Sequence, residues 1–121
     1  TEEVLAEYIE TVHDRDRFMY AHEGQMIGCG EVLYNGEFQP RLGRLLIGPK
    51  AQRKKGHGAR ITRELIEYVK RTKGHQRIYL NVFTDNEAAI NSYSKTGFKK
   101  THAEPKLIPK LNKSAWLMHF D

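Results

Sequence analysis

The sequence Arg53-Lys54-Lys55-Gly56-His57-Gly58-Ala59 stands between an apolar run, residues 45–49, and an amphipathic segment that continues to Thr72. The pattern predicts a strand that passes through a basic, glycine-containing turn into a helix. A helix N-terminus presents free backbone N–H groups and the positive end of the helix dipole. Glycines without a Cβ let an anion approach the main chain closely. The stretch therefore predicts a phosphate-binding turn.

Two better-known phosphate motifs are excluded by the same residues. A Walker loop needs Gly-Lys-Ser or Gly-Lys-Thr, and neither tripeptide occurs in the chain. The dinucleotide fingerprint needs a third glycine at the position where Ile61 stands. An ordinary basic loop that caps a helix stays open as the alternative at this point.

Length and composition predict one globular domain over residues 1–121. No apolar run approaches the length that crosses a bilayer, so we expect no membrane partner. The acidic start, Thr1-Glu2-Glu3, lacks the layout of a secretion signal, and Cys29 has no second cysteine with which to form a disulfide. A cytoplasmic location is the simplest expectation.

The net charge of +5 is unevenly distributed along the chain. Basic residues concentrate in residues 50–63 and again in residues 99–113, while acids concentrate in residues 1–16. A local basic patch suits a polyanionic small molecule as well as it suits nucleic acid. Because no aromatic residues are interleaved with the basic patch, nucleic acid is the less favoured partner.

Hydrophobic periodicity and turn residues predict the order of the elements. We expect a helix over residues 2–13 that covers a sheet, strands over 18–22 and 26–33, a turn-rich loop over 34–40, a strand over 42–47, a helix over 58–72, a strand over 78–83, a helix from 85–86 that stops at Gly97, and closing strands over 98–103 and 115–120. A strand, a helix and a strand in succession predict a right-handed crossover between parallel neighbours.

Two motifs together resemble the GNAT superfamily of N-acetyltransferases. The first is Arg53-x-x-Gly56-x-Gly58, and the second is the spacing of Asn86, Ala89, Tyr93, Gly97 and Phe98. The resemblance covers residues 16–121 and implies an α/β (α+β) fold. Its central sheet would be mixed and mostly antiparallel, with one parallel strand-helix-strand crossover and helices on both faces. The chain would start at the family's second helix, without the usual first strand and helix.

The resemblance implies acetyl-coenzyme A (acetyl-CoA) as cosubstrate. Backbone N–H groups of the basic turn would bind its pyrophosphate, and the end of the preceding strand would pair with its pantetheine arm. Asn86 would hydrogen-bond the same arm, or cap its own helix. The residues implied in binding are Leu46, Ile47, Arg53, Lys54, Lys55, Gly56, His57, Gly58, Ala59, Asn86 and Tyr93.

Acetyl transfer to an amine needs groups that move protons, because a primary amine with a pKa near ~10 is protonated at neutral pH. Tyr93 stands where the family places a phenol that protonates the leaving thiolate; a core aromatic is the alternative. Glu31 is the remaining carboxylate for the base, acting directly or through a water. A solvated strand residue, or proton loss to water without any single base, is the alternative. The histidines have no metal-ligand spacing, so no metal is expected.

The function expected from the resemblance is transfer of an acetyl group from acetyl-CoA to a primary amine by direct attack. The acceptor would be a small molecule, such as a polyamine, an amino acid or an aminoglycoside, or a protein N-terminus or lysine. A non-catalytic or degenerate CoA-binding protein of the same fold is the alternative. Dimerisation is common in that family, so a homodimer is a further expectation.

Overall fold

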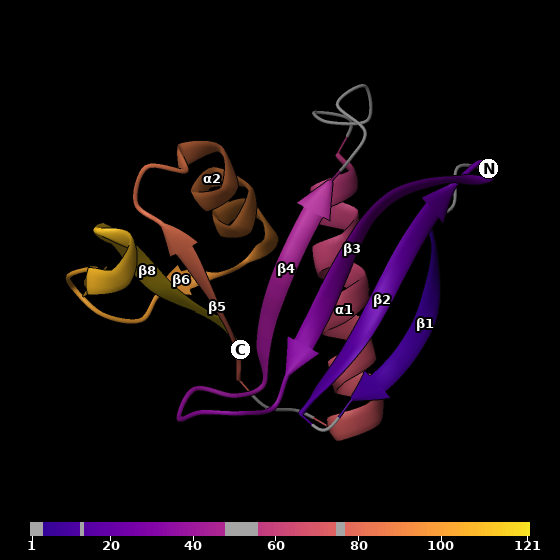
Figure 1. The fold of residues 1–121 in the computed structure, drawn as a ribbon, viewed down its shortest axis with the longest axis horizontal. Coiled ribbons are helices and arrows are strands. Elements are labelled where there is room, and N and C mark those ends of the chain that lie inside the picture. The colour runs from indigo at the N-terminus through magenta and orange to yellow at the C-terminus, as the bar shows by residue number, and fades with distance from the viewer. Residues whose placement is uncertain (1–3, 13, 48–55, 75–76) are drawn as a thin grey trace.

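The computed structural model describes residues 4–12, 14–47, 56–74 and 77–121. Most of these residues form one sheet with helices packed against it (Figure 1). The strands are β1 (Val4–Val12), β2 (Arg15–His22), β3 (Gln25–Leu33), β4 (Arg41–Ile47), β5 (Ile78–Phe83), β6 (Lys99–Lys100), β7 (Lys106–Ile108) and β8 (Lys113–Phe120). The helices are α1 (His57–Lys73), α2 (Glu87–Thr96) and the 3-10 turn η2 (Pro109–Leu111).

The sheet is mixed and mostly antiparallel. Its strand order is β1-β2-β3-β4-β5-β8-β6, and β7 pairs with β8 beside this path. Only β4 and β5 are parallel among the described pairs, and α1 connects them. This arrangement confirms the expected sheet and its single strand-helix-strand crossover.

The first hairpin turn follows from its residues. Glu23 and Gly24 both have positive φ, 52° and 77°, in the two-residue connection between β2 and β3. Positive φ at both positions matches the right-handed twist of the flanking strands. The predicted turn at residues 23–25 is therefore confirmed.

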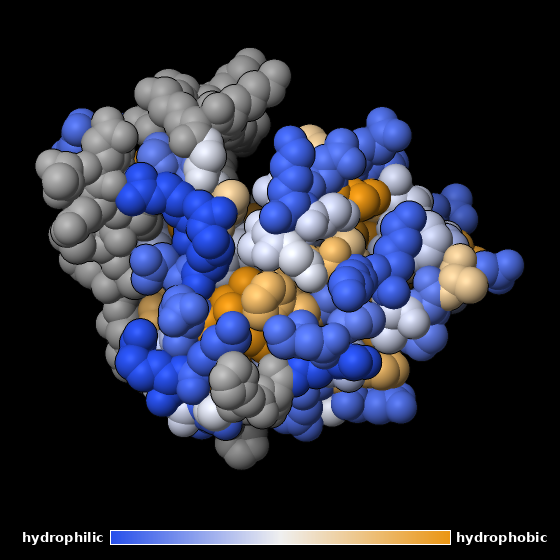
Figure 2. Space-filling view, turned by 180° about the vertical axis from the view of Figure 1, so that it is seen from behind, coloured by the Kyte–Doolittle hydropathy of each residue, from blue (hydrophilic) through white to orange (hydrophobic). Residues whose placement is uncertain are grey.

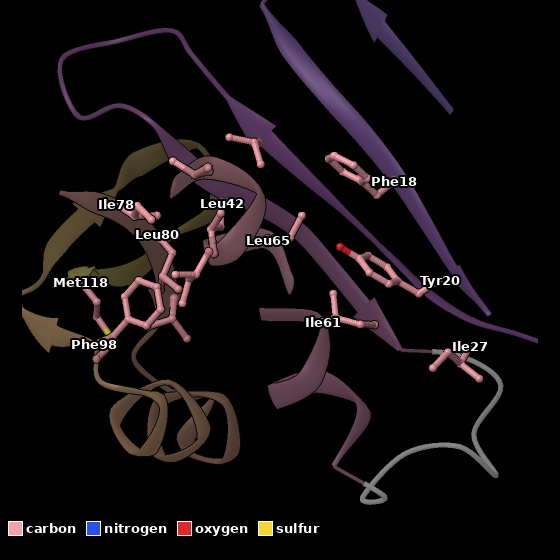
Figure 3. Packing of buried hydrophobic residues seen from close by; sticks show 14 residues of the cluster. Phe18, Tyr20, Ile27, Leu42, Ile61, Leu65, Ile78, Leu80, Phe98 and Met118 are labelled. Carbon is pink, nitrogen blue, oxygen red and sulfur yellow. The ribbon is translucent and has the colours of Figure 1, made fainter. Parts of the chain in front are cut away.

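The apolar core lies between the sheet and the helices. α1 presents Ile61, Leu65, Ile66 and Val69 to it at helical spacing, and each of these side chains is buried. Figure 3 shows Phe18, Tyr20 and Ile27 near the α1 residues, and Ile78, Leu80, Phe98 and Met118 at the other end of the same cluster. Partly buried residues of α2, Ala89, Ile90 and Tyr93, pack against this cluster too. α1 and α2 thus share one core.

Close packing of α1 on the sheet depends on Gly30 in β3. A Cβ at this position would stand 2.9 Å from Leu65 Cδ1 and 3.1 Å from Leu45 Cδ2. Because a real Cβ is essentially never as close as 2.9 Å to a neighbour, a larger residue would force the Leu65 side chain, and to a lesser extent that of Leu45, to move. Gly30 therefore leaves room for the leucine side chains that pack between α1 and the sheet.

The predicted helix over residues 2–13 is wrong, because residues 4–12 form β1. β1 pairs antiparallel with β2 from Val4–His22 to Val12–Arg15. Its sequence is rich in β-branched and aromatic residues, which favour strands. The apolar spacing that suggested a helix is also compatible with a strand, and pairing with β2 decides the outcome. Pairing is a tertiary property.

The C-terminal strands differ from the prediction in extent. The strand expected over 98–103 is reduced to Lys99–Lys100, and the loop that follows contains β7 and η2. β8 begins two residues earlier than expected, at Lys113. The remaining predicted elements are confirmed, although β2 begins three residues before the predicted strand and the other ends shift by one or two residues.

Candidate active site

The parallel strands β4 and β5 separate near the middle of the sheet. Their described pairing consists of Arg41–Tyr79 and Leu42–Leu80, whereas β4 continues to Ile47 and β5 to Phe83. Figure 1 shows the two arrows diverging beyond the paired residues. On its other edge, β4 stays paired with β3 as far as Ile47. The edge of β4 that faces β5 is therefore available to pair with an extended ligand.

A recess lies on the helix side of this opening. It has a volume of about 160 Å³. Figure 2 views the molecule from the side of α1 and shows the surface hollowed near its upper edge. The lining residues come from β4, the first turns of α1 and the middle of α2: Leu45, Gly58, Ile61, Thr62, Ala89, Ser92 and Tyr93. The recess therefore brings the N-terminus of α1 close to the predicted catalytic tyrosine.

At the N-terminus of α1 the two motif glycines differ, because Gly56 has a positive φ whereas Gly58 already belongs to the helix and does not. Gly56 precedes the helix in a left-handed conformation, with φ 79° and ψ 5°. The first turn of α1 contains no acidic residue, so no carboxylate there opposes a bound anion. Thr62 Oγ1 donates a hydrogen bond to the Gly58 carbonyl at 2.8 Å and occupies one face of this turn. His57 is buried and begins the helix.

Tyr93 is held by α2 and by Phe98, which lies between α2 and β6. Its ring meets the buried Phe98 ring edge-on, with centroids 5.9 Å apart and planes at 63°. Burial raises the pKa of the Tyr93 phenol above its ordinary value. The phenol consequently stays protonated at neutral pH and is able to donate a proton.

Both ends of α2 are fixed by motif residues. At its start, the Asn86 side chain accepts a hydrogen bond from the Ala89 N–H at 3.2 Å, which is the helix cap expected as one role of Asn86. At its end, Gly97 has φ 120° and donates its N–H to the carbonyls of Tyr93 and Ser94, both at 3.1 Å. These two ends set where Tyr93 enters the recess.

Glu31 lies away from the recess lining, on β3. Its carboxylate forms ion pairs with Arg17 Nε at 2.7 Å and with Arg15 Nη1 at 3.5 Å. The side chain is only 5% exposed, so these pairs are shielded from solvent. These contacts bind Glu31 to β2.

Apart from Glu31, the predicted site residues fall into four groups. Gly58 and Tyr93 meet in the recess, while Gly56, His57, Ala59 and Asn86 stand at the N-termini of the two helices. Leu46 and Ile47 end β4 and continue its pairing with β3. The predictions for Arg53, Lys54 and Lys55 fall outside the described residues. The sequence reasoning did not assign Leu45, Thr62 or Ser92 to the site; helical spacing from Gly58 points to Thr62.

Among the described residues there is neither a metal-binding cluster nor a helix that could span a membrane. They contain no cluster of three or more His, Cys, Asp or Glu side chains that could hold a metal ion. None of the described helices combines the length and the apolar character that crossing a membrane requires.

Comparison with known proteins identifies the family. The sequence model of the protein family described as "Acetyltransferase (GNAT) family" matches residues 1–98. The chain therefore belongs to this family. An uncharacterized protein of Mycobacterium leprae (strain TN) is 35% identical over 91 residues, which make up 75% of this chain and 24% of that protein. The chain thus spans about a quarter of the length of this relative.

Solved structures share the fold at lower identity. Spermidine N-acetyltransferase from Vibrio cholerae, in complex with CoA and spermine, has a TM-score of 0.74 at 20% identity, covering 88% of this chain and 65% of that one. An acyl-CoA N-acyltransferase from Pseudomonas aeruginosa has a TM-score of 0.70 at 21% identity, covering 91% and 70%. Escherichia coli ElaA has a TM-score of 0.72 at 15% identity, also covering 91% and 70%. These likenesses show the fold.

Proposed function

We propose that the chain transfers an acetyl group from acetyl-CoA to a primary amine by direct attack. The observation that carries the proposal is the divergence of β4 from β5 beside a recess that contains both Gly58 and Tyr93. Membership of the acetyltransferase family supports the same reaction. The Vibrio cholerae spermidine N-acetyltransferase, which shares the fold, was solved in complex with CoA and spermine, and this also supports the proposal.

The residues present fit acetyl-CoA. The free edge of β4 beyond Leu42 would pair with the amide-bearing pantetheine arm as if that arm were a short strand. The start of α1, without acid in its first turn, suits the negatively charged pyrophosphate. A recess of about 160 Å³ suits the thioester end of the molecule rather than its nucleotide. When bound, acetyl-CoA supplies an activated acyl group.

The proposed chemistry assigns one proton transfer to Tyr93. The amine first loses a proton, and its nitrogen then forms a bond to the acyl carbon while the carbon–sulfur bond breaks. The electron pair of the broken bond stays on sulfur, which takes a proton from the Tyr93 phenol. The nitrogen loses its second proton, and the phenol is reprotonated from solvent. An ammonium ion and a thioester thus give an amide, a thiol and one proton.

The base that removes the first proton is proposed as Glu31, acting directly or through water, with proton loss to water alone as the alternative. Glu31 is held in ion pairs with Arg15 and Arg17, and a base held in this way would have to leave both partners to reach an amine, which favours the alternative. The variant Glu31→Gln separates the two. If the fall in rate at acidic pH disappears in this variant, Glu31 acts as the base. If the pH–rate profile is unchanged and the stability is reduced, the role of Glu31 is to form the ion pairs.

The test of the proposed function is a transfer assay with a panel of amines. The chain is incubated with acetyl-CoA and each amine, and both the released thiol and the acetylated amine are measured. Thiol release that requires an amine, with acetylated product in equal amount, is expected. Binding of CoA without transfer to any amine would instead support a non-catalytic CoA-binding protein.

A further inference from the structure

A second and larger cavity lies on the face of β5 and β8 that points away from the core. Ile78, Leu80 and Val82 alternate along β5 as buried core residues, so Asn81 and Phe83 point to the opposite face. Asn81 pairs with Leu117 and Phe83 with Ala115, and all four residues line the cavity. Its volume of about 510 Å³ lies within the range of about 300–1,000 Å³ that is usual for small-molecule sites.

Two segments far apart in the sequence form the walls of this cavity. Residues 34–40 contribute Phe38, whose ring packs edge-on against Tyr79 with centroids 5.3 Å apart. The same ring lies 6.1 Å from the His102 ring of the second segment, residues 101–113. Phe38 therefore joins the two walls to each other and to the sheet.

The lining is predominantly apolar. Phe38, Phe83, Leu107, Ile108, Ala115 and Leu117 are among the lining side chains. Leu107 is 55% exposed, although its side chain faces a concave surface where a ligand would cover it. Burying such a side chain against an apolar group is favourable, whereas a strongly hydrated ligand gains nothing from it. The walls therefore select a ligand with an apolar body.

The charges around the cavity balance. Glu37 and Glu104 oppose Arg41 and Lys106 among the lining residues. Arg41 is fixed in place, because its guanidinium donates to the carbonyls of Asn35 and Phe38, at 3.1 and 3.2 Å, and to Asn35 Oδ1 at 2.8 Å. A ligand with one ammonium group could pair with the carboxylate of Glu37 or Glu104. A polyamine would bring further positive charges against the immobile guanidinium, without a net negative field to compensate.

The cavity also borders the opening between β4 and β5. Asn81, Val82 and Phe83 follow Leu80, the last β5 residue that pairs with β4. The recess with Tyr93 reaches the same opening from the helix side, through Leu45 of β4. An amine in the cavity would thus approach the acyl group from the opposite face of the sheet.

We propose that this cavity binds the acceptor, and that the acceptor is an amine with a single positive charge and an aromatic or branched aliphatic body, not a polyamine. That the ligand acts as an acceptor rests on the proposed acetyl transfer. The chemistry of the ligand is inferred from the cavity lining alone. Phenethylamine and spermidine are suitable probes, because they differ in apolar body and in number of charges.

The test measures binding of each probe by calorimetry, with and without saturating CoA. The variant Leu107→Gln removes apolar surface from the cavity, and Leu111→Gln is the matched control, since Leu111 is 56% exposed in the same segment and does not line the cavity. We expect phenethylamine to bind at least about tenfold more tightly than spermidine, and Leu107→Gln to weaken its binding by about tenfold. Leu111→Gln should leave phenethylamine binding unchanged.

Three results would overturn the inference: spermidine binding as tight as phenethylamine binding, no phenethylamine binding with or without CoA, or equal effects of the two leucine variants. The proposed function fails separately. Its failure appears as absence of CoA binding and of acetyl transfer to any amine, and neither result depends on which amine the cavity prefers.

Discussion

The Tyr93 phenol is half-buried at the recess, and burial raises its pKa, so that it is protonated at neutral pH as the proposed role of proton donor requires. The variant Tyr93→Phe removes the phenol oxygen and keeps the ring that packs against Phe98. We expect kcat to fall by about 100-fold, with the KM for acetyl-CoA little changed, because the proton transfer acts only in the transition state. Steady-state kinetics with a saturating amine measure both constants.

The control for this prediction is Tyr79→Phe, which removes a phenol oxygen from β5 while keeping the ring contact with Phe38. It should leave kcat within about twofold of the unaltered chain. An unchanged kcat in Tyr93→Phe would assign Tyr93 to the core and remove it from the mechanism.

At the scale of single elements, α2 depends on its first capping bond. In Asn86→Ala the Ala89 N–H loses its side-chain acceptor, and we expect a loss of about 1 kcal/mol in the free energy of unfolding. Asn86→Asp keeps an acceptor oxygen and should retain most of that stability. Urea denaturation of the three proteins measures the difference; equal stability of the Ala and Asp variants would contradict the capping role.

The end of α2 gives a second prediction. Gly97 has φ 120°, and a Cβ there would stand 2.9 Å from Phe120 Cε2. Gly97→Ala should therefore lower the free energy of unfolding by about 2 kcal/mol through backbone strain and the displaced ring. Gly24→Ala is the control, since Gly24 also has positive φ but no atom within 4 Å of its Cβ position. Equal losses in the two variants, measured by urea denaturation, would exclude the contact with Phe120.

At the scale of the whole molecule, one buried carboxylate connects three segments. Asp16 of β2 accepts hydrogen bonds from Tyr34, after β3, at 2.8 Å, and from Tyr68 of α1 at 2.6 Å. Burial and the hydrogen bond to Asp16 raise the pKa of Tyr34. This shift stabilises the fold below the unfolded pKa of about 10, and the contribution is lost as the pH rises above that value.

We therefore expect the free energy of unfolding to fall as the pH rises from about 9 to about 12, and to fall less steeply in Tyr34→Phe, which cannot ionise at this position. Urea denaturation at a series of pH values measures the two slopes. Parallel slopes would show that ionisation of Tyr34 is not coupled to unfolding.

The parts of the fold that were predictable are those with local signals. β5 is a run of β-forming residues, and α2 is bounded by a capping Asn86 and a terminating Gly97. Residues 4–12 lacked such a signal, because the spacing of Val4, Tyr8 and Val12 fits a helix as well as a strand. Pairing with β2 decides between the two structures, and local periodicity does not indicate which strand a segment will pair with.

The residues that line the candidate site were predictable to a similar degree. Gly58 and Tyr93 belong to short motifs, whereas Leu45 and Ser92 line the recess only because β4 and β5 diverge at Leu42 and Leu80. The outer cavity could not be predicted, since its two walls come from segments about sixty residues apart that meet through Phe38 and His102.

The measurement that tests the central claim most directly is calorimetric binding of acetyl-CoA to the unaltered chain, to Gly58→Asp and to Gly58→Asn. The two variants have side chains of similar shape at the edge of the recess and differ in charge. We predict binding in roughly the micromolar range for the unaltered chain, and at least about tenfold weaker binding for the Asp variant than for the Asn variant, because the carboxylate repels the pyrophosphate. No binding by the unaltered chain, or equal binding by the two variants, would contradict the account.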